Sequence, residues 1–278
     1  MRLKVIFLLM SVLLFSSLGA SFSYAYKIDP EWKEYKSDHF MVSYHPSIPS
    51  KYIREFTRKC ERYYHLIAER MGFKRFDFWS WENRAKIFVY GSKQDYVKFS
   101  GREAWSAASV HVRNKFISTY YFADQFFDRY LPHELTHIVL REFIGFKTLV
   151  PFWFEEGLPC ANEDDCYVRY LLVAKGLVDK NTHFSVPELE GLGRGALKHQ
   201  RKFYSMAASV VIFLLEEFGK DQFVRFCREL RDGEAFYSAM NKVYRIGDYH
   251  DLNGKFLIFL SNKSYEDIAT AQNTNVNW

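Results

Sequence analysis

The segment His133-Glu134-Leu135-Thr136-His137 constrains this chain more than any other. Residues four positions apart lie on the same face of an α-helix, so a helical segment directs both imidazoles at one metal ion. Glu134 then lies beside the first imidazole, where its carboxylate can take a proton from a water molecule that the metal activates. We therefore predict a helix over about Asp124 to Phe143 that holds Zn²⁺ through its two histidines, with Glu134 as general base.

Pro132 limits where the regular part of this helix can begin. Inside a helix, a proline removes a backbone hydrogen bond and clashes with the preceding turn, whereas in the first turn it is tolerated. We therefore expect the regular helix to start at Leu131 or at Pro132 itself.

A third metal ligand is expected at Glu156, which follows His137 after 18 residues within Trp153-Phe154-Glu155-Glu156-Gly157-Leu158. This arrangement resembles the gluzincin metallopeptidases, in which H-E-x-x-H precedes a glutamate within W-x-x-E-G-[FLM]-[AS]. The motif is similar to the aminopeptidase N branch, whereas the size and layout resemble small exported peptidase-MA-like proteins of bacteria. The resemblance implies that His133, His137 and Glu156 bind one Zn²⁺ in a thermolysin-like α+β fold, and that Glu134 is the base.

Two departures from the family pattern bear on the substrate and on the site. Aminopeptidases of this branch carry G-x-M-E-N before the metal helix, and no such stretch occurs between Gly101 and Arg129. An exopeptidase is therefore unsupported, and an endopeptidase or a more unusual substrate is favoured. After E-G-L, Pro159 replaces the usual alanine, and Cys160 stands where many relatives have an acidic or small residue.

Other side chains are candidates for supporting roles. A carboxylate commonly orients a histidine ligand from behind, and Glu163, Asp164 and Asp165 are alternatives for that role. Glu155 is another, although a solvated neighbour of the site is the favoured interpretation. The developing oxyanion needs a donor besides the metal. By resemblance to small relatives this donor is Tyr204; the alternative is that Tyr204 only belongs to the apolar stripe of its helix.

The predicted elements are mixed first and helical afterwards, which indicates an α+β fold. Strands are expected at 34–45 and 84–91, and a hairpin or bent strand at 109–121 that turns near Arg113. The segment 178–200 is expected to be mostly loop because of its glycine, proline and polar content. Helices are expected at 50–72, 93–99, 203–219, 221–231, 233–243 and 249–261, with a helical region from the E-E-G-L segment to Gly176. We predict an α/β lobe with a small mixed sheet over 26–144 and a helical lobe over 145–278.

Residues 1–25 have the layout of a secretory signal peptide. A positively charged start precedes an apolar run from Val5 to about Ala20, and Ser23 and Ala25 are small residues at a plausible cleavage site. The alternative is an uncleaved membrane anchor. No second apolar stretch approaches the length that spans a bilayer. We therefore expect a mature metallopeptidase domain over 26–278 that is secreted or periplasmic, at the cell envelope.

The four cysteines permit two disulfide bonds in an exported chain. On one continuous helix, the Cα atoms of Cys160 and Cys166 would be about 9 Å apart, so a bond between them needs a loop or a break between the two residues. For Cys60 and Cys227, a small buried apolar side chain is as good an interpretation as a disulfide bond.

Composition narrows the class of function. The net charge of +5 and the absence of a long basic run argue against binding to nucleic acid.

The sequence predicts a secreted zinc metallopeptidase that acts on peptides or proteins. Because aromatic residues make up 19% of the chain, a non-catalytic zinc-containing protein that binds envelope polymers or partner proteins stays an alternative. A hydrolase of a non-peptide amide or ester is the other alternative.

Overall fold

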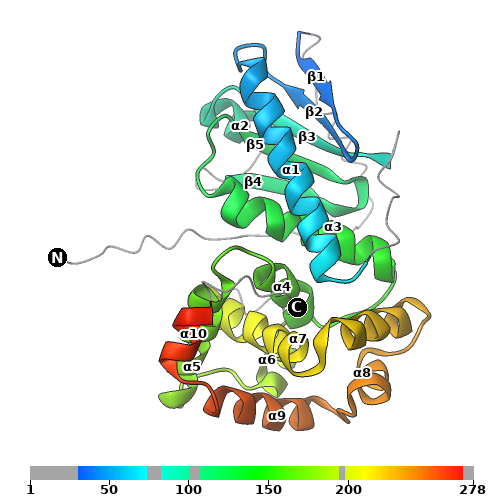
Figure 1. The fold of residues 1–278 in the computed structure, drawn as a ribbon, viewed down its shortest axis with the longest axis vertical. Helices are drawn as coiled ribbons and strands as arrows, with labels where there is room; N and C mark the ends of the chain where they lie inside the picture. Colours follow the sequence, from blue (N-terminus) through cyan, green and yellow to red (C-terminus); the bar gives the residue numbers. More distant parts are fainter. Residues whose placement is uncertain (1–30, 74–82, 101–106, 194–197, 272–278) are drawn as a thin grey trace, which may run out of the picture. The chain divides into compact units, whose positions relative to one another are not determined.

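The computed structural model describes residues 31–73, 83–100, 107–193 and 198–271 (Figure 1). The predicted signal peptide lies outside the described residues. The described residues form two compact units, one from residues 31–63, 83–100 and 107–134 and the other from residues 64–73, 135–193 and 198–271. The lobe limits predicted from the sequence, 26–144 and 145–278, stay a prediction.

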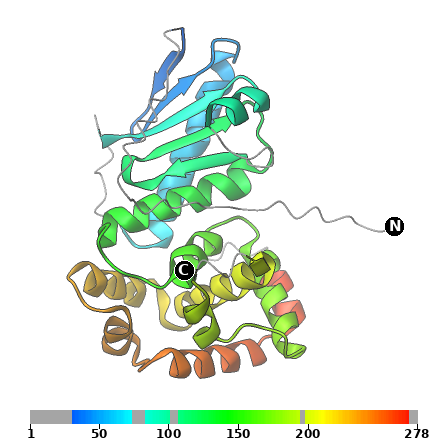
Figure 2. The same ribbon diagram turned by 180° about the vertical axis from the view of Figure 1, so that it is seen from behind.

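The first unit is built on a mixed sheet of five strands in the order β1-β2-β3-β5-β4, visible from both sides in Figures 1 and 2. The strands are β1 Lys33–Lys36, β2 Phe40–Tyr44, β3 Ala85–Tyr90, β4 Ala108–His111 and β5 Phe116–Tyr120. The three central strands are parallel, with Val42 opposite Ile87 and Ile87 opposite Ile117. The outer strands β1 and β4 run antiparallel to their neighbours.

The predicted strand at 34–45 is two strands, so this expectation was wrong in one respect. The chain reverses after β1, where the backbone N–H of Ser37 donates to the carbonyl of Phe40 at 2.9 Å. Alternate residues of β2 are buried, as its sequence pattern predicts, because one face of this strand packs on the core. By contrast, four successive residues are buried at the end of β3, which lies between two parallel neighbours.

The predicted hairpin at 109–121 is confirmed. Strands β4 and β5 are antiparallel, with Ser109 opposite Ser118. They are joined by a short 3-10 turn, Val112–Asn114, and by Lys115, whose φ of 53° is left-handed. Within the described residues, strand β4 pairs with β5 alone and therefore forms one edge of the sheet.

Three helices alternate with these strands along the chain. Helix α1 (Ser50–Arg70) follows β2, α2 (Lys93–Ser100) follows β3, and α3 (Leu131–Ile144) comes after β5. Helix α3 contains the H-E-x-x-H segment and begins at Leu131, which confirms the start expected from Pro132. A π-helical turn, Phe126–Tyr130, precedes it. All ten residues from Leu131 to Leu140 are buried.

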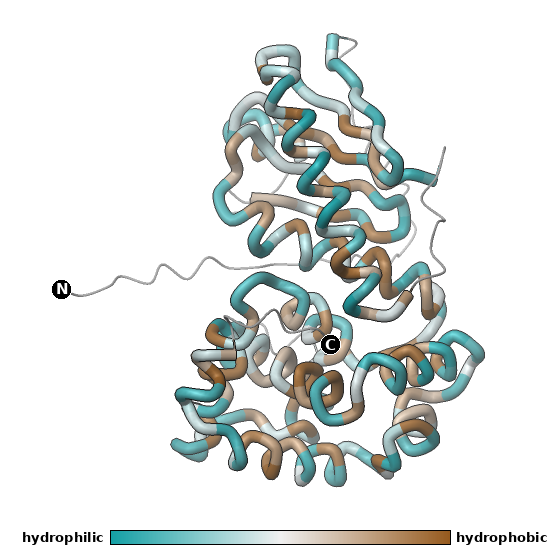
Figure 3. Tube along the Cα trace, in the orientation of Figure 1, coloured by the Kyte–Doolittle hydropathy of each residue, from teal (hydrophilic) through white to brown (hydrophobic). Residues whose placement is uncertain are grey.

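The second unit is helical. In addition to the C-terminal part of α3, it contains seven helices in the described residues: α4 Phe152–Ala161, α5 Leu172–Asp179, α6 Val186–Leu192, α7 Gln200–Arg231, α8 Phe236–Tyr244, α9 Tyr249–Ser261 and α10 Tyr265–Ala271. Its core lies along α7, where every residue from Phe203 to Leu215 is buried and much of the helix is hydrophobic in Figure 3. Gly219 has a φ of 76° and kinks α7, which separates the helices predicted at 203–219 and 221–231.

The loop expected at 178–200 was wrong in part, because it contains helix α6. The side chain of Ser185 accepts a hydrogen bond from the backbone of Glu188, whose carboxylate in turn accepts one from the backbone of Ser185. This capping box supplies hydrogen-bond partners for the first turn of α6. The helix has only seven residues, too few for an apolar periodicity to be recognised in the sequence.

The described residues confirm the α+β fold, with a small mixed sheet and a majority of helix. None of the helices in the described ranges combines the length and the apolar character needed to cross a membrane. All four cysteines lie in described segments, each is buried, and no disulfide bond joins any of them.

Candidate metal centre

Helix α3 positions two histidines and a glutamate on consecutive turns. His133, Glu134 and His137 are almost completely buried, with at most 4% of each residue exposed. The helix is unbroken from Leu131 to Ile144, so its own hydrogen bonds fix the spacing of the two imidazoles. The helical conformation predicted for the motif is confirmed.

Glu156 approaches these histidines from helix α4. Its side chain is completely buried, and Oε1 lies 4.0 Å from Nε2 of His137. His133, His137 and Glu156 each offer one possible ligand atom, and the three atoms lie within 4.8 Å of one another. The structure therefore brings together the three side chains that the sequence predicts as ligands.

Gly157 allows helix α7 to pack closely against the segment that carries Glu156. A Cβ atom built on Gly157 would lie 2.5 Å from the carbonyl oxygen of Ala207, closer than such atoms can approach. Trp153, one turn before Gly157, donates from its indole nitrogen to Glu190 at 2.9 Å, which ties the start of α4 to α6. Close packing on one side and this hydrogen bond on another hold α4 in place.

Glu155 contributes to the position of α4 through an ion pair. Arg141 on α3 donates from Nε to Oε1 of Glu155 at 2.8 Å and from Nη1 to the carbonyl oxygen of Thr148 at 2.7 Å. The expectation that Glu155 is a solvated neighbour of the site was therefore wrong, since both side chains of the pair are mostly buried. A fixed bond between α3 and α4 keeps the helices that carry the candidate ligands together.

Of the three acidic residues in the loop after α4, Glu163 is the one that lies near His133. The possible ligand atoms of His133, Cys160 and Glu163 are within 4.8 Å of one another, and all three side chains are buried. Tyr170 donates to Oε2 of Glu163 at 2.7 Å. Asp164 is only partly buried and Asp165 is exposed.

The sequence does not by itself bring Cys160 into the site. The spacing could have indicated it, because Cys160 follows Glu156 by four positions on the same short helix and therefore lies on the same face. For Tyr204, the structure shows the place of the residue in the fold. This residue is buried in α7 one turn before Ala207, and its role as an oxyanion donor stays a prediction.

The residues of this group fit a zinc ion. Two imidazoles and a carboxylate are the ligand types that zinc takes in catalytic sites, where a fourth position is left for water or substrate. A buried carboxylate is also costly unless a positive charge or several donors compensate it. A cation between Glu156 and the two histidines would balance the charge of this buried carboxylate.

Comparison with known families agrees with this arrangement. A model of the Peptidase MA superfamily matches residues 85–262, which is more than half of the chain and includes helices α3 and α4. No curated protein matches the chain.

Proposed function

Because the chain belongs to the Peptidase MA superfamily, a family of peptidases, we propose that it is a zinc-dependent metallopeptidase of the gluzincin type. The observation that carries this proposal is the approach of His133, His137 and Glu156 to within 4.8 Å, with Glu134 in the same turn of α3 as His133. A purely structural zinc site has no need of a carboxylate beside its first ligand.

The proposed chemistry assigns separate tasks to these residues. His133, His137 and Glu156 would hold the zinc ion. When bound, zinc polarises a carbonyl group and makes water a better nucleophile at neutral pH. Glu134 takes a proton from the attacking water as the carbon–oxygen bond forms, and passes it to the leaving amine as the carbon–nitrogen bond breaks.

Tyr204 is proposed as an additional donor to the oxyanion that develops during the attack. Support for this comes from the packing of α7 against α4, which places Ala207, one turn after Tyr204, against the residue that follows Glu156. A lost oxyanion donor typically costs a factor of about 10²–10³ in kcat. Replacing Tyr204 with Phe tests the role, because a residue that only packs in the core would leave kcat close to the wild-type value.

We propose that the substrate is a peptide or protein bound in an extended conformation. Strand β4 supports this proposal, because it is an edge of the sheet to which an extended segment can add by backbone hydrogen bonds. The sequence between Gly101 and Arg129 has no G-x-M-E-N stretch to bind a free amino terminus, so we propose cleavage within chains rather than from the end.

We also propose that the protein acts outside the cytoplasm, secreted or at the cell envelope. This proposal rests on the signal-peptide pattern of residues 1–25 alone. Amino-terminal sequencing of the protein recovered from its native source tests it, since cleavage would place the first residue at Tyr26. An intact amino terminus would favour the membrane anchor.

The deciding experiment measures zinc content and cleavage of a peptide library by the purified protein. We expect one catalytic zinc ion, cleavage that a chelator abolishes, and loss of cleavage with retained zinc in Glu134→Gln. Glu142→Gln, on the same helix but only partly buried, is the matched control and should remain active. Zinc binding without hydrolysis of any peptide would contradict the peptidase and favour an envelope-binding protein or a non-peptide substrate.

A further inference from the structure

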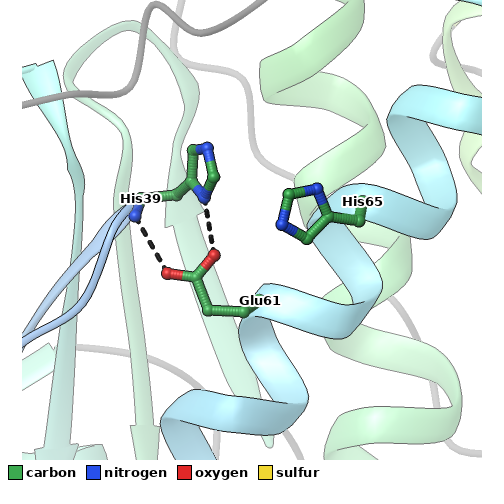
Figure 4. Close-up of side chains that lie close together, drawn as sticks. All are labelled: His39, Glu61 and His65. Atoms are coloured by element: carbon green, nitrogen blue, oxygen red, sulfur yellow. Dashed lines mark hydrogen bonds and ion pairs between the residues drawn. The ribbon is translucent and has the colours of Figure 1, made fainter.

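A second group of metal-ligand side chains lies in the turn before strand β2 and on helix α1. We propose that His39, Glu61 and His65 form a further binding site for Zn²⁺ or a chemically similar divalent transition-metal ion. Figure 4 shows the three side chains together. They share no residue with the candidate metal centre on α3 and α4, and the proposal does not depend on the proposed function.

Helix α1 supplies two of the three side chains. Glu61 and His65 are four positions apart, so they lie one turn apart on the same face of an unbroken helix. A histidine and a carboxylate at this spacing can reach the same ion without any change in the backbone.

The third side chain, His39, comes from the turn between β1 and β2. Its backbone N–H donates to Oε1 of Glu61 at 2.9 Å, and its Nδ1 lies 2.6 Å from Oε2 of the same carboxylate. Both oxygens of Glu61 are therefore oriented by His39, as Figure 4 shows. Two of the three proposed ligands are already held in place by the fold, which reduces the entropy lost when an ion binds.

The three possible ligand atoms lie within 4.8 Å of one another. This separation leaves a single ion within reach of all three after small side-chain rotations. Imidazole nitrogen favours zinc, copper and nickel, whereas magnesium and calcium prefer sites made of oxygen atoms alone. The composition of the group therefore selects a transition metal.

Burial decreases steadily across the group and leaves one side open. His39 is buried, Glu61 is partly buried and His65 is exposed. An ion can reach the site from the solvent beside His65, and water can complete the coordination shell. A site of this kind, with three protein ligands and an open position, is one of the arrangements that zinc adopts.

The alternative interpretation is that His39 and Glu61 only bind each other and fix the start of β2 to α1. His65 separates the two interpretations, because it takes no part in the two hydrogen bonds between His39 and Glu61. It is also exposed, so its replacement should leave the fold intact.

The test is the number of zinc ions bound per chain at a buffered concentration of free Zn²⁺, measured on purified protein by elemental analysis. We expect the wild type to bind one ion more than His65→Gln. The matched control is His250→Gln, an exposed histidine on helix α9 that belongs to neither group, and it should bind as many ions as the wild type. Circular dichroism of each variant confirms that the fold is retained.

Equal zinc content in wild type and His65→Gln would overturn the proposal. Two ions in the wild type and one in His65→Gln would support both metal sites. One ion in the wild type and none in His65→Gln would support the site on α1 while contradicting the metal centre on α3 and α4. His39→Asn is a second variant, which should also bind one ion fewer than the wild type while circular dichroism shows a retained fold.

Discussion

Nε2 of His137 and Oε1 of Glu156 lie 4.0 Å apart with both residues buried, although 18 residues separate them in the chain. Their approach depends on how helices α3 and α4 pack, and the Arg141–Glu155 ion pair ties the same two helices together. Adjacent glutamates on α4 thus have different partners: Glu155 binds an arginine, and Glu156 lies beside a histidine.

Replacing each of these glutamates by glutamine should give opposite results. Glu156→Gln removes a proposed ligand, so we expect zinc affinity to fall by more than the roughly 10–100-fold that the loss of an outer partner costs. Glu155→Gln should keep its zinc but lower the free energy of unfolding by about 1.5–3 kcal/mol, because Arg141 loses a charged hydrogen-bond partner. Zinc titration and urea unfolding measure the two effects. Full zinc affinity in Glu156→Gln would contradict the ligand assignment.

Glu163→Gln tests whether this carboxylate positions His133. The amide keeps the size of the side chain and can still accept the hydrogen bond from Tyr170, but it loses the ion pair with Arg169, so circular dichroism must confirm the fold of the variant. We expect zinc affinity to fall about 10–100-fold and kcat to fall with little change in KM. Asp165→Asn is the control, since Asp165 is exposed and asparagine tolerates its left-handed backbone. If both variants bind zinc like the wild type, Glu163 has only a structural role.

Gly157→Ala should destabilise the protein and weaken zinc binding. The added methyl group would meet the backbone of Ala207 at 2.5 Å, and such overpacking typically costs about 1–3 kcal/mol. Moving α4 away from α7 would also move Glu156. Gly254→Ala, within helix α9, has no atom within 4 Å of the new Cβ and should stabilise by up to about 1 kcal/mol. Urea unfolding of both variants checks the contrast, and equal stabilities would show that the helices can separate freely.

Ser185→Ala removes the cap of helix α6 and should lower the free energy of unfolding by about 1 kcal/mol at neutral pH. Hydrogen bonds from the backbone and side chain of Ser185 hold the pKa of Glu188 below its ordinary value. The contribution of this carboxylate is therefore complete above the unfolded-state pKa and is lost as the pH falls through the lower, folded-state pKa.

The difference between wild type and Ser185→Ala should accordingly become smaller below about pH 4, which lies near the ordinary pKa of glutamate. Urea unfolding of both proteins across this range measures the change. A difference that stays constant with pH would show that Glu188 has no part in the cap.

The four thiols should resist modification in the folded protein. Each cysteine is buried and outside any disulfide bond, and burial raises the pKa of the Cys166 thiol to about 12 and those of Cys60 and Cys227 well above their ordinary value. Since the thiolate is the reactive form, we expect little reaction with an aromatic disulfide reagent before denaturation and four reactive thiols after it. Fewer than four in the denatured, unreduced protein would indicate a disulfide bond.

Sequence alone predicted the features that depend on short-range spacing. The two histidines of H-E-x-x-H share a helix face because four residues make about one turn, and Pro132 limits the helix start because it lacks an N–H group. The hairpin at 109–121 follows in the same way from its alternation and its polar turn. The resemblance to a known family added Glu156, which the spacing of the first motif could not supply.

Tertiary packing decided which distant groups meet. Four acidic residues were open alternatives behind the first histidine, and the path of the chain after α4 brings Glu163 near His133 while Glu155 binds Arg141. Packing also brings His39 to Glu61 on helix α1, and it leaves all four cysteines without a disulfide bond. Each of these depends on contacts between residues far apart in the chain, whereas spacing along a helix or strand specifies only which side chains share a face.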